Sequence, residues 1–537
     1  MKNTLILLFV CCATLMNAQF ISSVTKPDSS AMLEVDENDP AFKAAMTITK
    51  EDLTKHLTIL ASDEFQGRET GYPGNDLASA YIAGEIKRIG IEPITGDSYF
   101  QKVDFKWISW DDISITVGEN RYKHLWDFLS FPDKNVDLGE VDLDEVIFLG
   151  YGIDDPKYTD YKRAKIEGKV IMINEGEPMD EDGKYIISGD TQETEWSQYP
   201  EKKLELAHKM GAKAVLIITK DIQKMLGENR RKLLGPTVVI GQSEDEEAPV
   251  ANSIYISSNI AKDIIGSKSK KMIKARKKMA KGKSKSLKLK TDMKLIQKRK
   301  DYSLAGNNIL AYMEGTDKKD ELLVVSAHYD HVGMKGDDVY NGADDNGSGS
   351  TTVLELAEAF QKAKMAGNGP RRSILFLWVT GEEKGLLGSE YYATYPVFPL
   401  ENTIADINID MVGRVDEKYK DNPNYIYVIG SDRISTDLHD ANEEVNRNYS
   451  QITLDYTYNS EDDPNRFYFR SDHYNFAKNG IPSIFFFNGV HEDYHKITDT
   501  VDKINFDKMT NVARHIFYLA WKLSNQEADL KITNGKA

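Results

Sequence analysis

The chain has 537 residues, of which 40% are hydrophobic and 28% are charged, and its formal net charge is -17. This length exceeds that of one ordinary domain, and the composition is that of a folded soluble protein. The negative charge argues against nucleic acid and anionic membrane surfaces as partners, and it constrains solubility rather than fold.

The first eighteen residues predict a signal peptide. Lys2 gives a positive start, residues 5–12 form an apolar core too short to cross a bilayer, and Ala18 ends a small-residue cleavage context. We therefore expect cleavage after Ala18, a secreted or periplasmic protein, and no transmembrane segment in the mature chain.

The two cysteines, Cys11 and Cys12, both lie in this segment. A lipoprotein signal ending at either one is an alternative, although neither Val10 nor Cys11 is the small residue that usually precedes such a cysteine. Cleavage after Ala18 would leave no cysteine, which excludes a disulfide framework, a cysteine nucleophile and a thiolate metal site. Any bound metal must then be held by His, Asp or Glu.

The next segment contains two predicted helices. Residues 19–45 are polar and lack sustained periodicity, so they predict a flexible leader. Thr49 followed by Asp52 is typical of a capping box and predicts a helix that ends near Ala61. After a turn-rich loop, an amphipathic pattern predicts a second helix over about 75–89, closed by Gly90.

From about residue 140 the pattern changes to short apolar runs bounded by glycine. These runs predict strands near 146–149, 170–173, 214–218 and 237–240, with a helix around 201–210. The segment therefore predicts an inserted α/β module. Lysines crowd residues 268–285 after it, which indicates either an anion-binding patch or a solvated helix face followed by a lysine-decorated edge strand. The acidic charge elsewhere favours the second interpretation.

Four continuous apolar runs follow, at 322–326, 373–379, 404–409 and 483–487. Continuous apolar strands that alternate with helices are typical of a sheet covered on both faces. The fold class that we predict is α/β, with a mixed, mostly parallel sheet that carries helices on both faces.

Polar residues able to bind metal follow each of these four runs. They are His328, with Asp345 in the glycine-rich loop after it, then Glu382 and Glu383, then Asp410, and finally His495. In open α/β sheets ligands bind beyond the carboxyl ends of strands. Zinc accepts imidazole and carboxylate ligands, and two neighbouring ions can act together on one substrate. A single histidine or acidic pair would be unremarkable, but recurrence at four strand ends predicts a metal site.

The order of these motifs resembles the co-catalytic dizinc aminopeptidase family, which also contains glutamate carboxypeptidase-like enzymes and the zinc-poor glutaminyl cyclases. The resemblance covers about residues 46–140 and 300–525, and its motifs are His-Tyr-Asp-His at 328–331, Gly-Ala-Asp-Asp-Asn-Gly-Ser-Gly at 342–349, Glu-Glu-Lys-Gly-Leu-Leu-Gly-Ser at 382–389, Asp-Met-Val-Gly at 410–413 and Tyr-His-Lys-Ile-Thr-Asp-Thr at 494–500.

The resemblance implies two Zn²⁺ ions per chain. His328 and Asp410 would bind one ion, Glu383 and His495 the other, and Asp345, rather than Asp344, would bridge both. It also implies a cis peptide bond after Asp345.

The resemblance further implies the catalytic groups. Glu382 would be the general base toward the metal-bound water, and Asp330 would orient His328. Asp499 and Thr500 would support the loop that carries His495. The residues placed near the substrate are Arg470, Ser471, Asp472 and Tyr494.

The inserted module is similar to the protease-associated domain, which the family often carries as an insertion that can roof the active site. The similarity lies in Glu-Gly-Lys-Val-Ile at 167–171 and in residues 207–217. The implied division is a signal peptide (1–18), a flexible leader (19–45), a first peptidase part (46–140), the protease-associated insertion (141–265), a lysine-rich connector (266–300) and a second peptidase part (301–537).

The predicted function is that of a secreted zinc exopeptidase acting on peptides or proteins, and family frequencies favour an aminopeptidase. A carboxypeptidase is the rival within the family, with Arg414 or Arg470 as the cation for a free carboxylate. A glutaminyl cyclase and a receptor-like protein without catalysis are two more rivals. A hydrolase with Ser471, Asp472 and His473 as a triad is set aside, because neighbours in sequence cannot assemble one. The sequence predicts neither the preferred side chain nor the oligomeric state.

Overall fold

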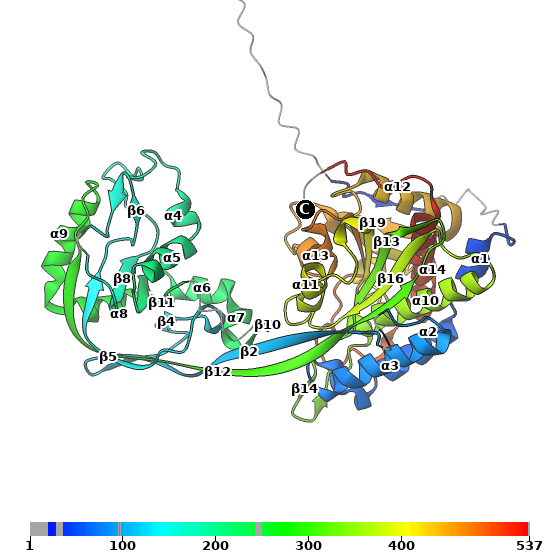
Figure 1. Ribbon diagram of the computed structural model, residues 1–537, viewed down its shortest axis with the longest axis horizontal. Helices are drawn as coiled ribbons and strands as arrows, with labels where there is room; N and C mark the ends of the chain where they lie inside the picture. The colour runs from blue at the N-terminus through cyan, green and yellow to red at the C-terminus, as the bar shows by residue number, and fades with distance from the viewer. Residues whose placement is uncertain are drawn as a thin grey trace, which may run out of the picture. The chain divides into compact units, whose positions relative to one another are not determined.

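The computed structural model describes residues 20–27, 36–94, 96, 98–162, 164–241 and 250–534. The chain divides into two compact units: unit 1 is Met1–Val103 with Ala305–Ala537, and unit 2 is Asp104–Leu304 (Figure 1). The predicted signal peptide, with Cys11 and Cys12, lies outside the described residues. Within the described part of the chain, no helix is long and apolar enough to cross a membrane.

Unit 1 is built on a mixed sheet with the strand order β1-β19-β18-β20-β17-β13-β16-β12. The central strands β20, β17, β13 and β16 run parallel, whereas β18 is antiparallel to β20 and β12 is antiparallel to β16. The strands are β1 (Val24–Thr25), β12 (Leu287–Met313), β13 (Lys318–His328), β16 (Arg372–Val379), β17 (Thr403–Ile409), β18 (Tyr425–Ile429), β19 (Thr453–Asp455) and β20 (Ser483–Phe487). A short hairpin, β14 (Met334–Lys335) and β15 (Asp338–Val339), follows β13.

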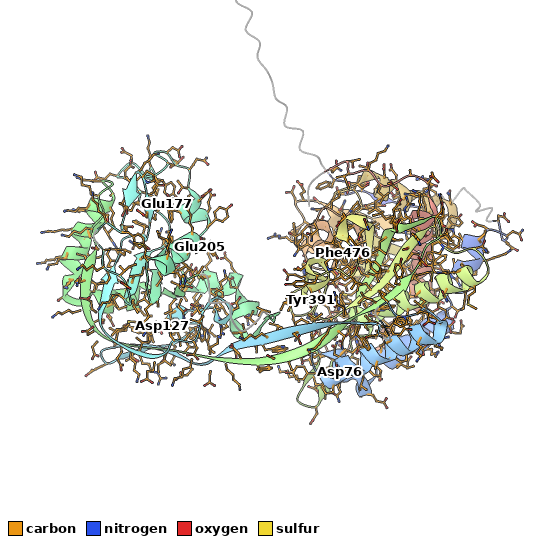
Figure 2. The ribbon with its side chains drawn as sticks, in the orientation of Figure 1. Asp76, Asp127, Glu177, Glu205, Tyr391 and Phe476 are labelled. Atoms are coloured by element: carbon orange, nitrogen blue, oxygen red, sulfur yellow. The ribbon has the colours of Figure 1, made fainter. Side chains whose placement is uncertain are left out.

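Helices cover both faces of this sheet, as the continuous apolar strands predict. Leu323 and Val325 of β13 belong to a core shared with α2, α3, α10 and α14. Leu322 and Val324 point the other way, into a core with Tyr392 of α11 and Phe476 of α13, the latter labelled in Figure 2. The helices are α1 (Pro40–Ala45), α2 (Lys50–Leu60), α3 (Pro73–Ile89), α10 (Gly349–Met365), α11 (Leu387–Thr394), α12 (Thr436–Val445), α13 (His473–Ala477) and α14 (Phe506–Asn525). The predicted fold class is confirmed.

The first two long helices begin and end where their caps predict. The Thr49 side chain accepts a hydrogen bond from the Asp52 amide at the start of α2. Gly90 closes α3 with a φ of 83°, a left-handed conformation that glycine adopts without steric cost.

The described part of the predicted flexible leader is structured. β1 pairs antiparallel with β19, and the Ile21 amide donates to the carboxylate of Asp432. Residues 40–45 form α1, whose N-cap Asp39 accepts a hydrogen bond from the Ala41 amide. These residues carry no periodic signal because the elements are short and are stabilised by contacts with distant parts of unit 1.

Unit 2 is an α/β unit of its own. The strands β5, β8, β9 and β11 lie side by side and parallel, with α8 and α9 on one face and α5 on the other. The strands are β2 (Phe100–Val117), β3 (Asn120–Tyr122), β4 (Phe128–Leu129), β5 (Gly139–Phe148), β6 (Asp154–Asp155), β7 (Tyr158–Thr159), β8 (Val170–Asn174), β9 (Ala214–Ile218), β10 (Thr237–Ile240) and β11 (Asn252–Ile256). The helices are α4 (Glu195–Gln198), α5 (Glu201–Lys209), α6 (Ile222–Glu228), α7 (Arg230–Leu234), α8 (Ser258–Ile265) and α9 (Ser269–Met279).

Unit 2 is larger than the predicted insertion. Residues 104–140, which we expected in the first peptidase part, belong to it because β2 pairs with β3, β10 and β12. The expected lysine-rich connector also belongs to it. Its helix α9 buries Met272, Ala275 and Met279 in the core, and its lysines lie on the remaining faces. Strand pairing and a buried helix face therefore extend the unit beyond the boundaries that composition indicated.

Candidate metal centre

The predicted ligands meet at the carboxyl edge of the unit 1 sheet. His328 is the last residue of β13, Glu383 lies four residues beyond β16, and Asp410 directly follows β17. His495 lies in the loop after β20, and Asp345 lies in the loop before α10. Because β13, β16, β17 and β20 are parallel, their carboxyl ends share one edge, and the loops beyond them bring these side chains together.

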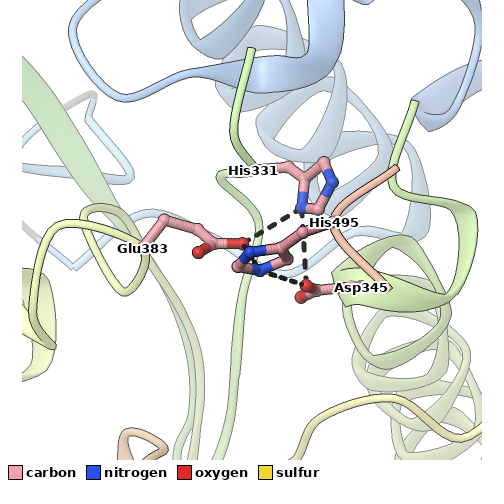
Figure 3. A group of neighbouring side chains, drawn as sticks. All are labelled: His331, Asp345, Glu383 and His495. Atoms are coloured by element: carbon pink, nitrogen blue, oxygen red, sulfur yellow. Dashed lines mark ion pairs between the residues drawn. The ribbon is translucent and has the colours of Figure 1, made fainter. Parts of the chain in front are cut away.

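The side chains form two groups that share Asp345. In the first group, His328 Nε2 lies 3.5 Å from Asp345 Oδ1 and 3.4 Å from Asp410 Oδ1. In the second, His495 Nε2 lies 3.0 Å from both Asp345 Oδ2 and Glu383 Oε1 (Figure 3). Asp344 belongs to neither group. Its carboxylate faces His491 and accepts hydrogen bonds from Gly413 N and Asn488 Nδ2.

These groups fit metal ions. Zinc bonds to nitrogen and oxygen are about 2.0–2.2 Å long, so adjacent ligand atoms in a tetrahedral site lie about 3.3–3.6 Å apart, close to the distances between these atoms. Asp345 Oδ2, Asp410 Oδ1 and His495 Nε2 are buried and make no hydrogen bond within the described residues. Neither Asp345 nor Asp410 forms a salt bridge with a described Lys or Arg, and the buried Arg68 acts on Asp345 only from a greater distance. A buried carboxylate needs a compensating charge, and a cation bound here would supply it.

The loop that carries Asp345 is held by the hydrogen bonds of two side chains, Asp499 and Asn346. The peptide bond between Asp345 and Asn346 is cis, which confirms the expectation. The Asp499 carboxylate accepts hydrogen bonds from the backbone amides of Asp344 and Asp345. The Asn346 amide group bonds Ile409 O and Met411 N, on either side of Asp410. Asp499 therefore contacts the Asp345 loop directly, in addition to lying in the segment after His495.

Asp330 lies next to His328, where it was expected to orient the ring, and it also contacts the loop that carries the two glutamates. The nearest group to His328 Nδ1 is the backbone carbonyl of Asp330, at 3.1 Å, whereas its carboxylate is 3.7 Å away. The carboxylate instead accepts hydrogen bonds from the amides of Glu382 and Glu383 and from the Thr70 hydroxyl. Asp330 thus fixes the tautomer of His328 through its backbone, and its side chain positions the two glutamates.

Glu382 lies beside the first group and is partly buried. Burial raises the pKa of Glu382 well above its ordinary value, and the nearby carboxylates of Glu383, Asp472 and Asp410 raise it further against the opposing effect of His328. A carboxyl whose pKa is raised in this way is a stronger proton acceptor than an ordinary glutamate.

Two of the four predicted substrate-binding residues are buried and form hydrogen bonds within the protein. Ser471 is buried and donates a hydrogen bond to Asp410 Oδ2, and Asn408 in turn donates to Ser471 Oγ. Asp472 is buried and accepts a hydrogen bond from Ser389. Ser471 and Asp472 are fully buried and are not among the residues that line the cavity at this site.

The other two, Arg470 and Tyr494, line a cavity that opens on the first group. Arg470 lies over the Phe467 ring, 5.0 Å from its centroid, and Tyr494 stacks on the His495 ring at 3.9 Å. Three carboxylates and five apolar side chains form the rest of its lining. The other lining residues are Asp345, Glu382, Asp410, Met411, Phe467, Phe485, Phe487 and Val490.

Two residues of the site were not assigned from the sequence. Arg68 is fully buried, and its guanidinium donates to the backbone oxygens of Leu60, Tyr329, Asn341 and Gly342, which ties the metal-site loops together. His331 belongs to the second group, with Nδ1 3.1 Å from Glu383 Oε1. Its place directly after His-Tyr-Asp was the available signal for His331, whereas nothing in the turn-rich loop distinguished Arg68.

Residues 308–520 match a family model described as Peptidase family M28. This stretch is a peptidase family M28 domain. The predicted resemblance to co-catalytic zinc aminopeptidases is therefore confirmed for it.

Individual proteins also resemble the M28 domain and its surroundings. A probable leucine aminopeptidase of Arthroderma otae is 33% identical over 214 residues, which are 38% of this chain and 55% of that protein. A probable leucine aminopeptidase of Trichophyton verrucosum is 31% identical over 214 residues, which are 38% of this chain and 55% of that protein. The chain thus spans about half the length of the curated relatives it matches. The solved structure of an aminopeptidase from Aneurinibacillus sp. strain AM-1 shares the fold, with a TM-score of 0.51, 19% identity, and coverage of 92% of this chain and 98% of that one.

Proposed function

We propose that this protein is a secreted zinc exopeptidase, and specifically an aminopeptidase that removes N-terminal residues from peptides. The observation that carries the proposal is the pair of metal-binding groups that share Asp345, with Glu382 beside them at a cavity. The M28 domain supports a peptidase, and the relatives named leucine aminopeptidase support this direction of cleavage.

In this proposal two zinc ions bind per chain. His328 and Asp410 would hold one, Glu383 and His495 would hold the other, and Asp345 would be shared by both. Zinc at such a site lowers the pKa of bound water and polarises the scissile carbonyl. Glu382 accepts the proton from the attacking water and delivers it to the leaving amine, for which its raised pKa is suited. Asp330 keeps Glu382 in place through its backbone amide.

The relatives named leucine aminopeptidase support an aminopeptidase over a carboxypeptidase. Three carboxylates line the cavity, but in this proposal Asp345 and Asp410 are metal ligands and Glu382 is the base. Arg470 is the single cation among the described lining residues, and it is the one candidate there for a free carboxylate. Arg414 is engaged elsewhere, because its Nη2 lies 2.8 Å from Asp493 Oδ2.

The apolar residues of the same cavity support a preference for apolar N-terminal residues. Phe467, Phe485, Phe487 and Met411 present carbon surface next to the metal groups. Burial of a leucine-sized side chain against such a surface is worth about 1.5–3 kcal/mol.

The remaining parts of the proposal concern the rest of the chain. The signal-like first eighteen residues support secretion or a periplasmic location. The parallel α/β arrangement of unit 2 supports its assignment as a protease-associated domain, with peptides as the partners of the enzyme.

Peptide cleavage with blocked ends tests the direction. We expect the zinc-loaded protein to cleave a leucine-initiated peptide with a free N-terminus, whether or not its C-terminus is amidated, and to leave the N-acetylated peptide intact. Cleavage of the acetylated but not the amidated peptide would indicate a carboxypeptidase. Full activity in thoroughly metal-stripped protein would contradict the zinc mechanism.

Zinc content distinguishes a peptidase from a glutaminyl cyclase and from a binding protein. We expect two zinc ions per chain. A single bound ion together with cyclisation of N-terminal glutamine would indicate a glutaminyl cyclase. Two bound ions with no cleavage of any peptide would indicate a binding protein, although all five ligand positions and the base are filled in this chain.

A further inference from the structure

His331 is a buried histidine without a hydrogen-bonding partner among the described residues. Its side chain is fully enclosed, and neither ring nitrogen makes a hydrogen bond to any of them. A polar group left unpaired in the interior costs about 1–3 kcal/mol, so such a group in a native structure calls for a partner. The five proposed zinc ligands and the base do not include His331, yet its Nδ1 faces one of those ligands, Glu383, at 3.1 Å.

The ring of His331 is held in place from two sides. Its backbone amide donates to Arg68 O. A side chain at position 342 would meet the ring, because a Cβ built on Gly342 lies 2.5 Å from His331 Cδ2 and 2.2 Å from Asp345 O. Glycine at 342 therefore lets the imidazole approach the loop that carries Asp345.

His331 Nδ1 faces the same two oxygens as His495. It lies 3.1 Å from Glu383 Oε1 and 3.7 Å from Asp345 Oδ2, whereas His495 Nε2 lies 3.0 Å from each (Figure 3). These two nitrogens and two oxygens are all within 4.8 Å of one another. The separations are close to the edges of a tetrahedral zinc site, about 3.3–3.6 Å.

The first group is different in composition. His328, Asp345 and Asp410 supply three ligand atoms, and no fourth candidate joins them within the described residues. Its cavity brings solvent to Asp345, Asp410 and Glu382. Zinc sites with four protein ligands are typically structural, whereas sites with three keep a position for water or substrate.

We propose that the two metal positions are unequal: His331 is a fourth protein ligand of the ion at Glu383 and His495, and the ion at His328 and Asp410 has three protein ligands and meets the substrate. This inference rests on the proposed zinc function. It makes the ion at Glu383 and His495 the more tightly bound of the two, because each added ligand from a preformed site strengthens binding.

Zinc titration of the full-length metal-free protein, in competition with a chelator, tests the inequality. We expect the wild type to bind two ions with different affinities. His331→Gln should weaken the tighter ion by about 100-fold or more, because even residues that only orient ligands contribute about 10–100-fold. The weaker ion should keep its affinity to within a few-fold.

His56→Gln is the matched control. His56 is also a buried histidine near a carboxylate, 3.5 Å from Glu355 Oε1, but it lies outside both metal groups. We expect this variant to bind both ions as the wild type does. Circular dichroism of the metal-free variants checks that each is folded before titration.

X-ray absorption at one equivalent of zinc identifies the ligands directly. We expect two imidazoles on the zinc in the wild type and one in His331→Gln. One imidazole in the wild type, or unchanged affinities in His331→Gln, would overturn the inference while leaving two bound zinc ions and the proposed function intact. A wild type that binds no zinc would instead overturn the proposed function.

Discussion

Two contacts between an imidazole and a glutamate in unit 1 differ in their charge state. His56 Nε2 lies 3.5 Å from Glu355 Oε1, between α2 and α10. His495 Nε2 lies 3.0 Å from Glu383 Oε1, at the sheet edge. Burial lowers the pKa of His56 and raises the pKa of Glu355 to about 8, which favours the neutral forms of both.

At the sheet edge burial also favours the neutral forms, but the neighbouring charged groups outweigh it. The carboxylates of Asp345 and Glu383 raise the pKa of His495 to about 10 against burial. The imidazoles of His331 and His495 lower the pKa of Glu383 well below its ordinary value, also against burial. Desolvation therefore decides the charge state of an isolated pair, whereas several converging partners make the charged forms stable. A metal ion bound here would take the place of the proton on His495, because zinc binds neutral imidazole and ionised carboxylate.

Replacement of the shared carboxylate should have the largest effect on the metal centre. We expect Asp345→Ala to lose both zinc ions and peptidase activity, because each group keeps only part of its ligands. Zinc content per chain measures this. Loss of a single ion would show that Asp345 does not bridge, and Glu355→Gln, which removes the isolated carboxylate, should retain both ions.

Replacement of the proposed base should leave the metal centre assembled but inactive. We expect Glu382→Gln to keep both zinc ions and to lower turnover by about 100-fold to 10,000-fold, the usual contribution of a general base. Steady-state kinetics and zinc analysis of the same sample are the measurements. Normal turnover in the zinc-loaded variant would exclude Glu382 as the base.

The isolated pair predicts a pH-dependent stability. Because the pKa of Glu355 rises from an ordinary 4.5 to about 8 on folding, the unfolded chain releases this proton first as the pH increases, and the free energy of unfolding falls between pH 4.5 and 8. Glu355→Gln should remove this loss, so it should stabilise unit 1 by about 3 kcal/mol more at pH 8 than at pH 5. Denaturant unfolding at the two pH values measures the difference.

Glu358→Gln provides a control of opposite sign on the same helix. Burial alone would raise the pKa of Glu358, but Lys362 and Arg88 lower it, so its ionised form stabilises the fold. Glu358→Gln should therefore not increase the free energy of unfolding at high pH relative to low pH. Equal pH dependence in Glu355→Gln and the wild type would contradict a raised pKa at Glu355.

The smallest expected effect is that of a substitution at the strand ends of unit 2. Thr219, just beyond β9, donates to Glu175 Oε2, just beyond β8, so these polar groups satisfy each other. We expect Thr219→Val to destabilise unit 2 by about 1 kcal/mol and to leave zinc content and peptidase activity unchanged. A loss of zinc in this variant would show that unit 2 contributes to the metal centre.

Most of the metal centre was predictable because its chemistry is tied to position along the chain. An apolar strand ends at His328, and two others end shortly before Glu383 and Asp410. Because these strands are parallel, their carboxyl ends share one edge of the sheet. The motif around Asp345 predicted that this residue is shared by the two metal groups and that a cis peptide bond follows it. Local sequence was sufficient for these residues because each needs only its own strand and loop.

Other features depended on contacts between distant segments. The extent of unit 2 follows from the pairing of β2 with β12, and the order in residues 20–27 follows from the pairing of β1 with β19. The side chain of Asp330 turned to the amides of the Glu382 loop, and Arg68 found four backbone oxygens on three segments. No local pattern encodes such partners.

The sequence by itself determined which residue types stand at the strand ends, and with them the five ligands and the base. The tertiary structure alone decided which further side chains join these groups. It placed His331 across from His495, where Glu383 and Asp345 face both rings, and it placed His56 between the Glu355 carboxylate and the Tyr81 hydroxyl. The physical reason is that the charge state and metal affinity of a buried group depend on how many partners converge on it, and convergence is a property of the folded chain.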